Sequence, residues 1–248
     1  MRLNGLGVVY GMTATLSVWK PKVEDREIEL SISQVWVSSG SYKKKNLQTI
    51  EIGWQVYPQL YNNDKTRLFT FWTNDTYQTG CYNLRCPGFV QTNRNIILGG
   101  AITPISVFGG RQSELDILVW KDRKHGNWWL SLGNGDNSLV GYWPAELFTS
   151  VDPADEVSWG GEIVDTHRFG RHTKTQMGSG HYPMEGFGKA SYIRNLASID
   201  INNNLQPIPK SNTDTQISKY YKVKNLETDN EPYFYFGGTG LSTHSGVL

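Results

Sequence analysis

The sequence predicts an all-β protein, an antiparallel β-sandwich of two packed sheets with little helix. Three observations predict this class. Short runs of alternating apolar and polar residues recur along the chain, turns rich in Gly, Asn, Asp and Pro separate them, and helical periodicity is nearly absent. Alternation with a period of two places every second side chain on the same face of a strand, as a packed sheet requires.

The predicted elements follow from these runs in order. Seven stretches are predicted to form strands: 13–19, 28–37, 50–56, 68–72, 115–120, 128–132 and 157–164. One helical turn is expected at 144–148, because Pro144 suits the first position of a helix. The polar stretch 202–212 contains two prolines and predicts a loop, and 241–248 predicts a frayed end.

Length and charge bound the organisation of the chain. Its 248 residues fit a single domain spanning 1–248, and no linker divides them. Lys and Arg number 24 against 23 Asp and Glu, so no charge excess attracts nucleic acid or an anionic membrane. No apolar run approaches the roughly 20 residues of a membrane span, and the first ten residues do not form a signal peptide. We expect a monomer that binds neither nucleic acid nor membrane.

Two sequence features indicate an oxidising compartment. Cys81 and Cys86 are the only cysteines, and the sequon Asn74-Asp75-Thr76 lies just before them. A disulfide across a short loop and a glycan on Asn74 both belong outside the cytosol. A zinc site is disfavoured because the chain has no second pair of ligands at a suitable spacing.

Two of the predicted strands each carry a glutamate beside glycine. Glu51 shares a face with Gly53 and Gln55, opposite an apolar face that should pack against the partner sheet. Glu162 shares a face with Gly160 in the later strand. Glutamate is depleted in strands, and glycine leaves room for a ligand backbone. Both glutamates are therefore candidate catalytic residues.

A pair of carboxyl groups can hydrolyse a peptide bond without a metal. The ionised group takes a proton from water, and the protonated group donates to the carbonyl and then to the leaving nitrogen. Two close carboxyls hold one proton between them, so activity should be highest in acid. The developing oxyanion needs a donor. The side-chain amides of Gln34 and Gln55 are the candidates for that role or for positioning the substrate.

Alternation alone does not single out these two glutamates. A glutamate on a strand face is more often simply solvated. The chain also offers four other candidates, Glu114, Glu146, Glu156 and Glu185.

Other catalytic chemistries fit the sequence less well. Ser179 lies near His181, but the surrounding residues lack the strand–turn–helix setting of a nucleophilic serine. His167 and His172 lie in a polar, Arg-rich segment that is typical of a surface loop. We therefore expect no metal and no cofactor.

Nine tryptophans are distributed over strands and turns. Core packing is expected for those within alternating runs, Trp36, Trp54, Trp120 and Trp159. The tryptophans beside turns or strand ends could instead line a binding groove; these are Trp72, Trp128, Trp129 and Trp143. An aromatic wall suits a proline ring and a sugar ring equally well.

Seven longer motifs occur in order between residues 50 and 180. They are Ile50-Glu51-Ile52-Gly53-Trp54 with its continuation to residue 61, then 71–75, 79–91, 126–130, 141–144, Trp159-Gly160-Gly161-Glu162 and 177–180. No single motif would suffice, but in this order they resemble the plant neprosin family, and the resemblance extends from about Tyr10 to Gly240.

This resemblance implies a secreted glutamic peptidase that cuts after proline in acid, with two catalytic glutamates on a sandwich of two antiparallel sheets. Residue by residue, the glutamates match Glu51 and Glu162, and the family's cysteine pair matches Cys81 and Cys86. The chain departs from the family's pattern in three respects. It has no signal peptide or activation segment, no cysteines for a second disulfide near its end, and Thr239 where many members have proline.

The sequence thus predicts a metal-independent glutamic endopeptidase, secreted or vacuolar, that acts on proline-containing peptides or proteins. Glu51 and Glu162 are its predicted acid–base pair. Two alternatives stay open. One is a carbohydrate-binding or glycoside-hydrolysing sandwich, which would also use paired carboxylates and aromatic platforms. The other is a catalytically inactive relative that only binds peptide.

Overall fold

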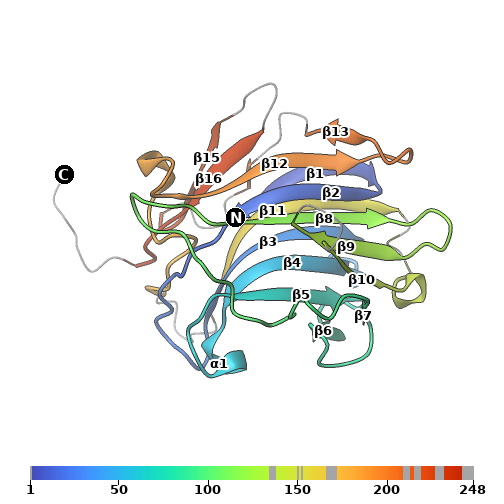
Figure 1. Ribbon diagram of the computed structural model, residues 1–248, viewed down its shortest axis with the longest axis horizontal. Helices are drawn as coiled ribbons and strands as arrows, with labels where there is room; N and C mark the ends of the chain where they lie inside the picture. Colours follow the sequence, from blue (N-terminus) through green and yellow to red (C-terminus); the bar gives the residue numbers. More distant parts are fainter. Residues whose placement is uncertain are drawn as a thin grey trace.

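A computed structural model of the chain describes residues 2–133, 138–149, 151, 153–165, 172–208, 213–214, 219–226 and 232–241. It contains two large antiparallel sheets that pack face to face (Figure 1). The predicted all-β sandwich is therefore confirmed.

The first sheet, sheet A, has its strands in the order β14-β1-β11-β3-β4-β5-β6. Its centre consists of β11 (Ala154–Val164), β3 (Leu30–Ser39) and β4 (Gln48–Val56). The flanking strands are β1 (Arg2–Val9) and β14 (Thr213–Asp214) on one side and β5 (Arg67–Thr73) and β6 (Gly80–Tyr82) on the other.

The second sheet, sheet B, has the order β15-β16-β12-β2-β8-β9-β10-β7, and β13 pairs with β12 beside this path. Its strands are β2 (Gly11–Ser17), β7 (Val90–Gln91), β8 (Glu114–Lys121), β9 (Trp128–Leu132), β10 (Leu139–Trp143), β12 (Ser191–Ile199), β13 (Leu205–Pro207), β15 (Lys222–Leu226) and β16 (Tyr233–Gly237).

All seven predicted strands are present, and their ends differ from the predicted ends by at most three residues. The predicted turn at 144–148 is the 3-10 helix η1 (Ala145–Leu147), with Pro144 as its N-cap. The loop predicted for 202–212 is wrong in part, because Leu205–Pro207 forms β13 on the edge of β12, where a proline needs no ladder partner. Residues 209–212 and 242–248 lie outside the described ranges.

Helix is confined to short segments in the described ranges: α1 (Pro58–Tyr61), η1 and η2 (Pro183–Glu185). None of these helices has the length and apolar character needed to cross a bilayer.

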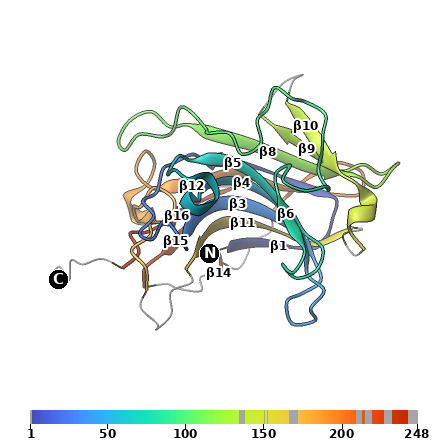
Figure 2. The same cartoon turned by 90° about the horizontal axis from the view of Figure 1, so that it is seen from below.

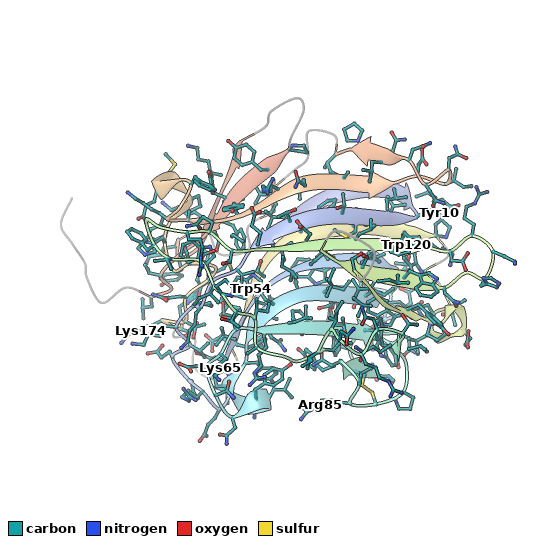
Figure 3. All side chains as sticks on the ribbon, in the orientation of Figure 1. Tyr10, Trp54, Lys65, Arg85, Trp120 and Lys174 are labelled. Carbon is teal, nitrogen blue, oxygen red and sulfur yellow. A yellow bond between two sulfur atoms is a disulfide. The ribbon has the colours of Figure 1, made fainter. Side chains whose placement is uncertain are left out.

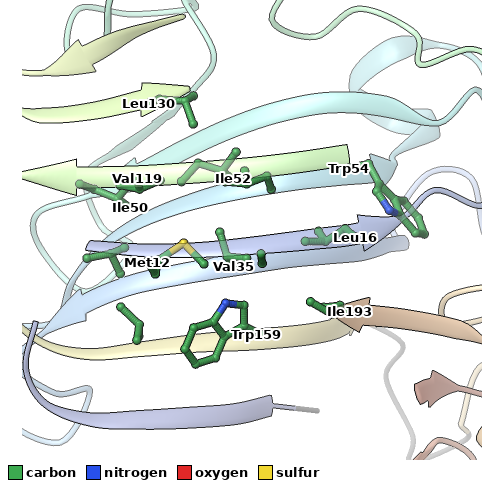
Figure 4. Close-up of a cluster of buried hydrophobic side chains, with 14 of the residues drawn as sticks. Met12, Leu16, Val35, Ile50, Ile52, Trp54, Val119, Leu130, Trp159 and Ile193 are labelled. Carbon is green, nitrogen blue, oxygen red and sulfur yellow. The ribbon is translucent and has the colours of Figure 1, made fainter. Parts of the chain in front are cut away.

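The main hydrophobic core lies between the two sheets (Figure 4). Ile50, Ile52 and Trp54 of β4 point into it, as the alternation at 50–56 predicts, and Met12 and Val119 meet them from sheet B. Burying such side chains removes large apolar areas from water, which stabilises the fold by about 1.5–3 kcal/mol for each side chain.

The expectations for tryptophan were only partly right. Trp54 and Trp159 are core residues, whereas Trp120 lies half-buried on β8 and is not part of this core. Three of the four tryptophans considered for a groove, Trp72, Trp128 and Trp143, are buried in the core instead.

Candidate active site

The outer face of sheet A carries both predicted glutamates. Glu51 on β4 stands opposite Trp36 on β3 and Phe71 on β5, and Glu162 on β11 stands opposite Ile32 on β3. Directly opposed residues of an antiparallel ladder share a face. Ile32 and Phe71 pack in a small apolar cluster that is separate from the core between the sheets. Both glutamates therefore lie on the face turned away from sheet B.

Two hydroxyl groups hold the side chain of Glu51. Its Oε1 accepts a hydrogen bond from Thr49 Oγ1 at 2.8 Å and another from Tyr77 Oη at 2.6 Å, and the residue is only 5% exposed. Donors directed at a carboxyl group stabilise its ionised form and fix its rotamer. The carboxyl of Glu51 is therefore oriented before any ligand binds.

Tyr77 reaches Glu51 from the turn between β5 and β6. Both Thr76 and Tyr77 have left-handed backbone conformations, with φ of 48° and 63°, which are unusual for residues of this size. The ring of Tyr77 stacks on Phe71, with centroids 6.0 Å apart and planes 14° apart, and on Tyr42 at 5.7 Å. The sequence reasoning missed this residue, because no periodic pattern marks a side chain that a strained turn places over a sheet.

Gln34 lies on β3 between the two glutamates. Its Nε2 donates to Glu162 Oε2 at 3.1 Å, and Gln34 is fully buried. Gly53 and Gly160 stand opposite Gln34 on the two neighbouring strands. A Cβ atom on Gly53 would come within 2.0 Å of the Ser33 carbonyl oxygen and 2.7 Å of the Gln34 Cα. Glycine is therefore required where the backbone of β4 approaches Gln34.

The register also defines how Glu51 and Glu162 are spaced. Glu162 aligns with Gln55 through Ile32, so the two glutamates are two strands apart and four residues apart along the ladder. In a flat sheet their Cα atoms would be about 16 Å apart, from about 4.8 Å per strand and 3.3 Å per residue. The strands of sheet A arch towards sheet B in Figure 2, so the outer face is on the inside of the bend. In this register Glu51 and Glu162 lie on opposite sides of Gln34, and Glu162 is hydrogen-bonded to it.

Tyr82 on β6 connects the two glutamates electrostatically. Burial raises the pKa of Tyr82, and the nearby carboxyl groups of Glu51 and Glu162 raise it further. A phenol loses its proton less readily when negative charge is nearby. Because both carboxylates act on the same hydroxyl, they belong to one electrostatic environment.

Gln55, the fourth predicted site residue, lies on the same face and is fully buried. Its Nε2 is 3.4 Å from the hydroxyl of Tyr61, a long hydrogen bond. The structure thus brings Glu51, Glu162, Gln34 and Gln55 to one face of sheet A. Their catalytic roles stay predictions.

The predicted disulfide between Cys81 and Cys86 is present, with Cα atoms 6.1 Å apart. It closes the short loop that follows β6, next to Tyr82. Asn74 of the sequon donates through Nδ2 to the carbonyl oxygen of Leu147 at 3.3 Å. A glycan on Asn74 would have to replace that bond, and glycosylation stays a prediction.

Three of the four other candidate glutamates lie away from this face. Glu114 is on β8 of sheet B, Glu146 is in η1, and Glu185 ends η2. Glu156 does share the outer face of sheet A, where its Oε1 accepts a hydrogen bond from Ser158 at 2.6 Å. Glu156 is therefore a natural control for the two predicted catalytic residues.

The serine and histidine candidates do not form a catalytic set. The Ser179 hydroxyl accepts from the backbone N–H of His181, whose ring contacts Glu185 at 3.0 Å. His172 contacts a backbone carbonyl, and His167 lies outside the described residues. Within the described ranges, no group of three or more His, Cys, Asp or Glu side chains is arranged to hold a metal ion.

Known proteins share the fold and the motifs of this chain. A crystal structure of scytalido-glutamic peptidase with a peptide based transition state analog aligns with a TM-score of 0.50 and 8% identity, over 94% of this chain and 95% of that one. A second structure of scytalido-glutamic peptidase, with a transition state analog inhibitor, aligns at 0.47 and 9% identity, with the same coverage. At such low identity the likeness concerns the fold alone.

The family assignment rests on the sequence. The neprosin family profile matches residues 27–239, nearly the whole chain. A match of this extent shows the family, and the family in turn supports a peptidase function. The chain belongs to the neprosin family.

Proposed function

We propose that this chain is a glutamic endopeptidase that cleaves on the carboxyl side of proline at acidic pH, with Glu51 and Glu162 as its acid–base pair. The observation that carries this proposal is the placement of both glutamates on one face of sheet A, with Gln34 between them and bonded to Glu162. The neprosin family assignment supports the choice of peptide as substrate.

The reaction needs two proton transfers. One carboxylate takes a proton from water as the water oxygen attacks the carbonyl carbon of the substrate. The other carboxyl group gives a proton to the amide nitrogen as the C–N bond breaks. The proposal assigns the two carboxyl groups to these separate steps, and the amides of Gln34 and Gln55 to positioning the substrate or stabilising the oxyanion.

Acidic pH follows from the protonation states that this reaction requires. One carboxyl must be ionised and the other protonated, and an unperturbed glutamate has a pKa of about 4.3. The fraction of molecules with one group in each state is therefore largest in acid and falls steeply towards neutral pH. A pH profile with a maximum in acid is the expected result.

Proline specificity is supported by the apolar surroundings of the glutamates. Phe69, Phe71, Tyr57 and Tyr82 pack together on the same face. A proline ring is apolar and its nitrogen carries no hydrogen, so it suits a wall of ring faces with few acceptors. The disulfide further supports a secreted or vacuolar location, because disulfides persist in oxidising compartments.

A cleavage assay tests this function. A proline-containing peptide is incubated with the protein at about pH 3 in the presence of a chelator, and the products are sequenced by mass spectrometry. Glu51→Gln and Glu162→Gln should each lower kcat/KM by about 10²- to 10⁴-fold. Glu156→Gln is the matched control, because it removes a carboxyl from the same face and should leave kcat/KM within about threefold.

The same assay includes oligosaccharides as substrates. Cleavage of sugar alone would assign the two carboxylates to glycoside hydrolysis. Binding of the peptide without cleavage would identify an inactive relative. Full activity in both correctly folded Gln variants, judged by thermal unfolding, would remove the proposed pair.

A further inference from the structure

The outer face of sheet B carries a row of aromatic side chains across three strands. Trp120 on β8 stands opposite Trp129 on β9, and Trp129 stands opposite Tyr142 on β10. We call these three residues the aromatic row. Figure 3 labels Trp120 on β8. The row spans two strand spacings, about 10 Å.

The rings of the aromatic row lie side by side and are partly open to solvent. Trp120 and Trp129 have centroids 6.4 Å apart and planes only 19° apart, and Trp129 and Tyr142 are 4.7 Å and 42° apart. All three residues are half-buried. Large rings at half exposure on a sheet face present flat surfaces to which another flat apolar surface can stack.

A pocket continues the aromatic row towards β12 and β13. Its volume is about 430 Å³, and it is lined by Thr13, Leu118, Trp120, Ile199, Asn203 and Leu205. Sites for small ligands have volumes of about 300–1,000 Å³. Trp120 belongs to both the pocket and the row, so a ligand in the pocket can extend over the rings.

One rim of the pocket is a turn whose shape is fixed by Asp200. The backbone N–H groups of Asn202 and Asn204 donate to Asp200 Oδ1 at 2.8 and 2.9 Å, and Gln206 Nε2 donates to Oδ2 at 2.6 Å. Asn203 in the centre of this turn has a left-handed backbone, with φ of 61°. The turn therefore presents Asn203 to the pocket without ordering on binding, which lowers the entropic cost of ligand recognition.

We propose that the aromatic row and this pocket bind a neutral oligosaccharide. None of the six described residues that line the pocket is charged, which disfavours an acidic or basic ligand. Sugar rings offer C–H groups that stack on the negative faces of aromatic rings. Their hydroxyls match the neutral groups of Thr13 and Asn203.

This site is independent of the proposed peptidase function, since it lies on the opposite side of the sandwich from Glu51 and Glu162. Binding there would hold the protein on a polysaccharide surface without blocking the outer face of sheet A. Hydrolysis of a short soluble peptide should therefore not respond to changes in the aromatic row.

Isothermal titration calorimetry measures the binding of the neutral sugars cellohexaose, laminarihexaose and mannohexaose. Hexagalacturonate is the acidic counterpart. At least one neutral hexasaccharide should bind and change the tryptophan fluorescence. Trp120→Ala should weaken that binding by about tenfold or more. Leu118→Asp, which places a charge in the pocket, should do the same if Trp120→Ala does not fold. Phe187→Ala removes an exposed aromatic ring elsewhere and is the matched control.

The proposal is overturned if no neutral hexasaccharide binds, or if hexagalacturonate binds as tightly. It is also overturned if binding survives unchanged in both folded variants. A wild-type dimer that Leu118→Asp dissociates in sedimentation would assign this face to self-association instead. Loss of peptide hydrolysis in folded Trp120→Ala would contradict the independence of the two faces.

Discussion

Glu51 and Glu162 on the outer face of sheet A have hydrogen-bond donors of a different kind from those of Glu114 on the outer face of sheet B. On sheet A, Glu51 accepts hydrogen bonds from hydroxyl groups and Glu162 accepts one from an amide. On sheet B, Glu114 accepts from Arg194 Nε and Nη2, both at 2.7 Å, so a fixed positive charge compensates its own. A guanidinium fixes the ionised form of a carboxyl more strongly than a single hydroxyl or amide donor does. The arginine donor therefore distinguishes Glu114, although all three glutamates lie in strands.

The largest effect on stability is expected from closing the space beside Gln34. Gly53→Ala would place a Cβ 2.0 Å from a backbone oxygen of β3, which cannot move without distorting the ladder. We expect a loss of about 3 kcal/mol in the free energy of unfolding. Gly109→Ala is the comparison, because a Cβ there meets nothing within 4 Å and only the φ of 66° adds a cost of about 1 kcal/mol. If urea denaturation gave equal losses of unfolding free energy for Gly53→Ala and Gly109→Ala, the close approach of the β4 backbone to β3 would be contradicted.

The disulfide should matter mainly for sheet A, because it lies at the edge of that sheet. Replacing Cys81 and Cys86 together by serine should lower the free energy of unfolding by about 2 kcal/mol, since the closed loop is short. Urea denaturation of the double variant and the wild type measures this difference. An unchanged midpoint would mean that the loop is equally constrained without the bond.

Removing the hydroxyl of Tyr77 tests whether the hydrogen bonds on sheet A tune the proposed chemistry. Tyr77→Phe should lower kcat/KM about tenfold, since a hydrogen bond to a charged group contributes about 1.5–3 kcal/mol. Tyr42→Phe is the control, because Tyr42 stacks on the ring of Tyr77. Equal values of kcat/KM for the two variants would show that Tyr77 acts only through packing.

The smallest effect is expected from the charge pair on sheet B. Hydrogen bonds from Arg194 and then Tyr192 hold the pKa of Glu114 below its usual range. The stabilisation is therefore complete above the unfolded pKa of about 4.3 and is lost as the pH falls through the folded pKa. Because the pair is solvent-exposed, Glu114→Gln should cost only about 0.5 kcal/mol near pH 7. The cost of Glu114→Gln in the free energy of unfolding should shrink as the pH falls below the unfolded pKa. An equal cost at pH 7 and in acid, measured by urea denaturation, would contradict this linkage.

Much of the fold could be predicted because strand alternation is a local property. The run 128–132 coincides with β9, and the outward position of Glu51 follows from the inward position of Ile50 and Ile52. The family motifs, rather than alternation, separated Glu51 and Glu162 from Glu156, which lies on the same face. Alternation shows that neighbours face opposite ways, but it does not show which face is the core, and this is why Trp120 was misplaced.

The geometry of the site could not be predicted, because it depends on long-range register. The alignment of Glu162 with Gln55 requires β11, β3 and β4 to pair in one particular register, although β11 begins only at Ala154, far along the chain from β3 and β4. Tyr77 depends on a turn with two consecutive left-handed residues, which no sequence pattern signalled. The pocket on sheet B depends on β13, within a stretch whose prolines suggested a loop.

Strand β3 runs between the strands of both glutamates and supplies Gln34 from its own middle. Inserting one residue into it would swing Gln34 inward and turn Val35 out, so this strand tolerates no change in length. Its neighbours on either side hold it in continuous ladders from Leu30 to Ser39. The spacing of the two glutamates is thereby tied to the interlocked middle of the sheet, and a change in a surrounding loop would leave that spacing as it is.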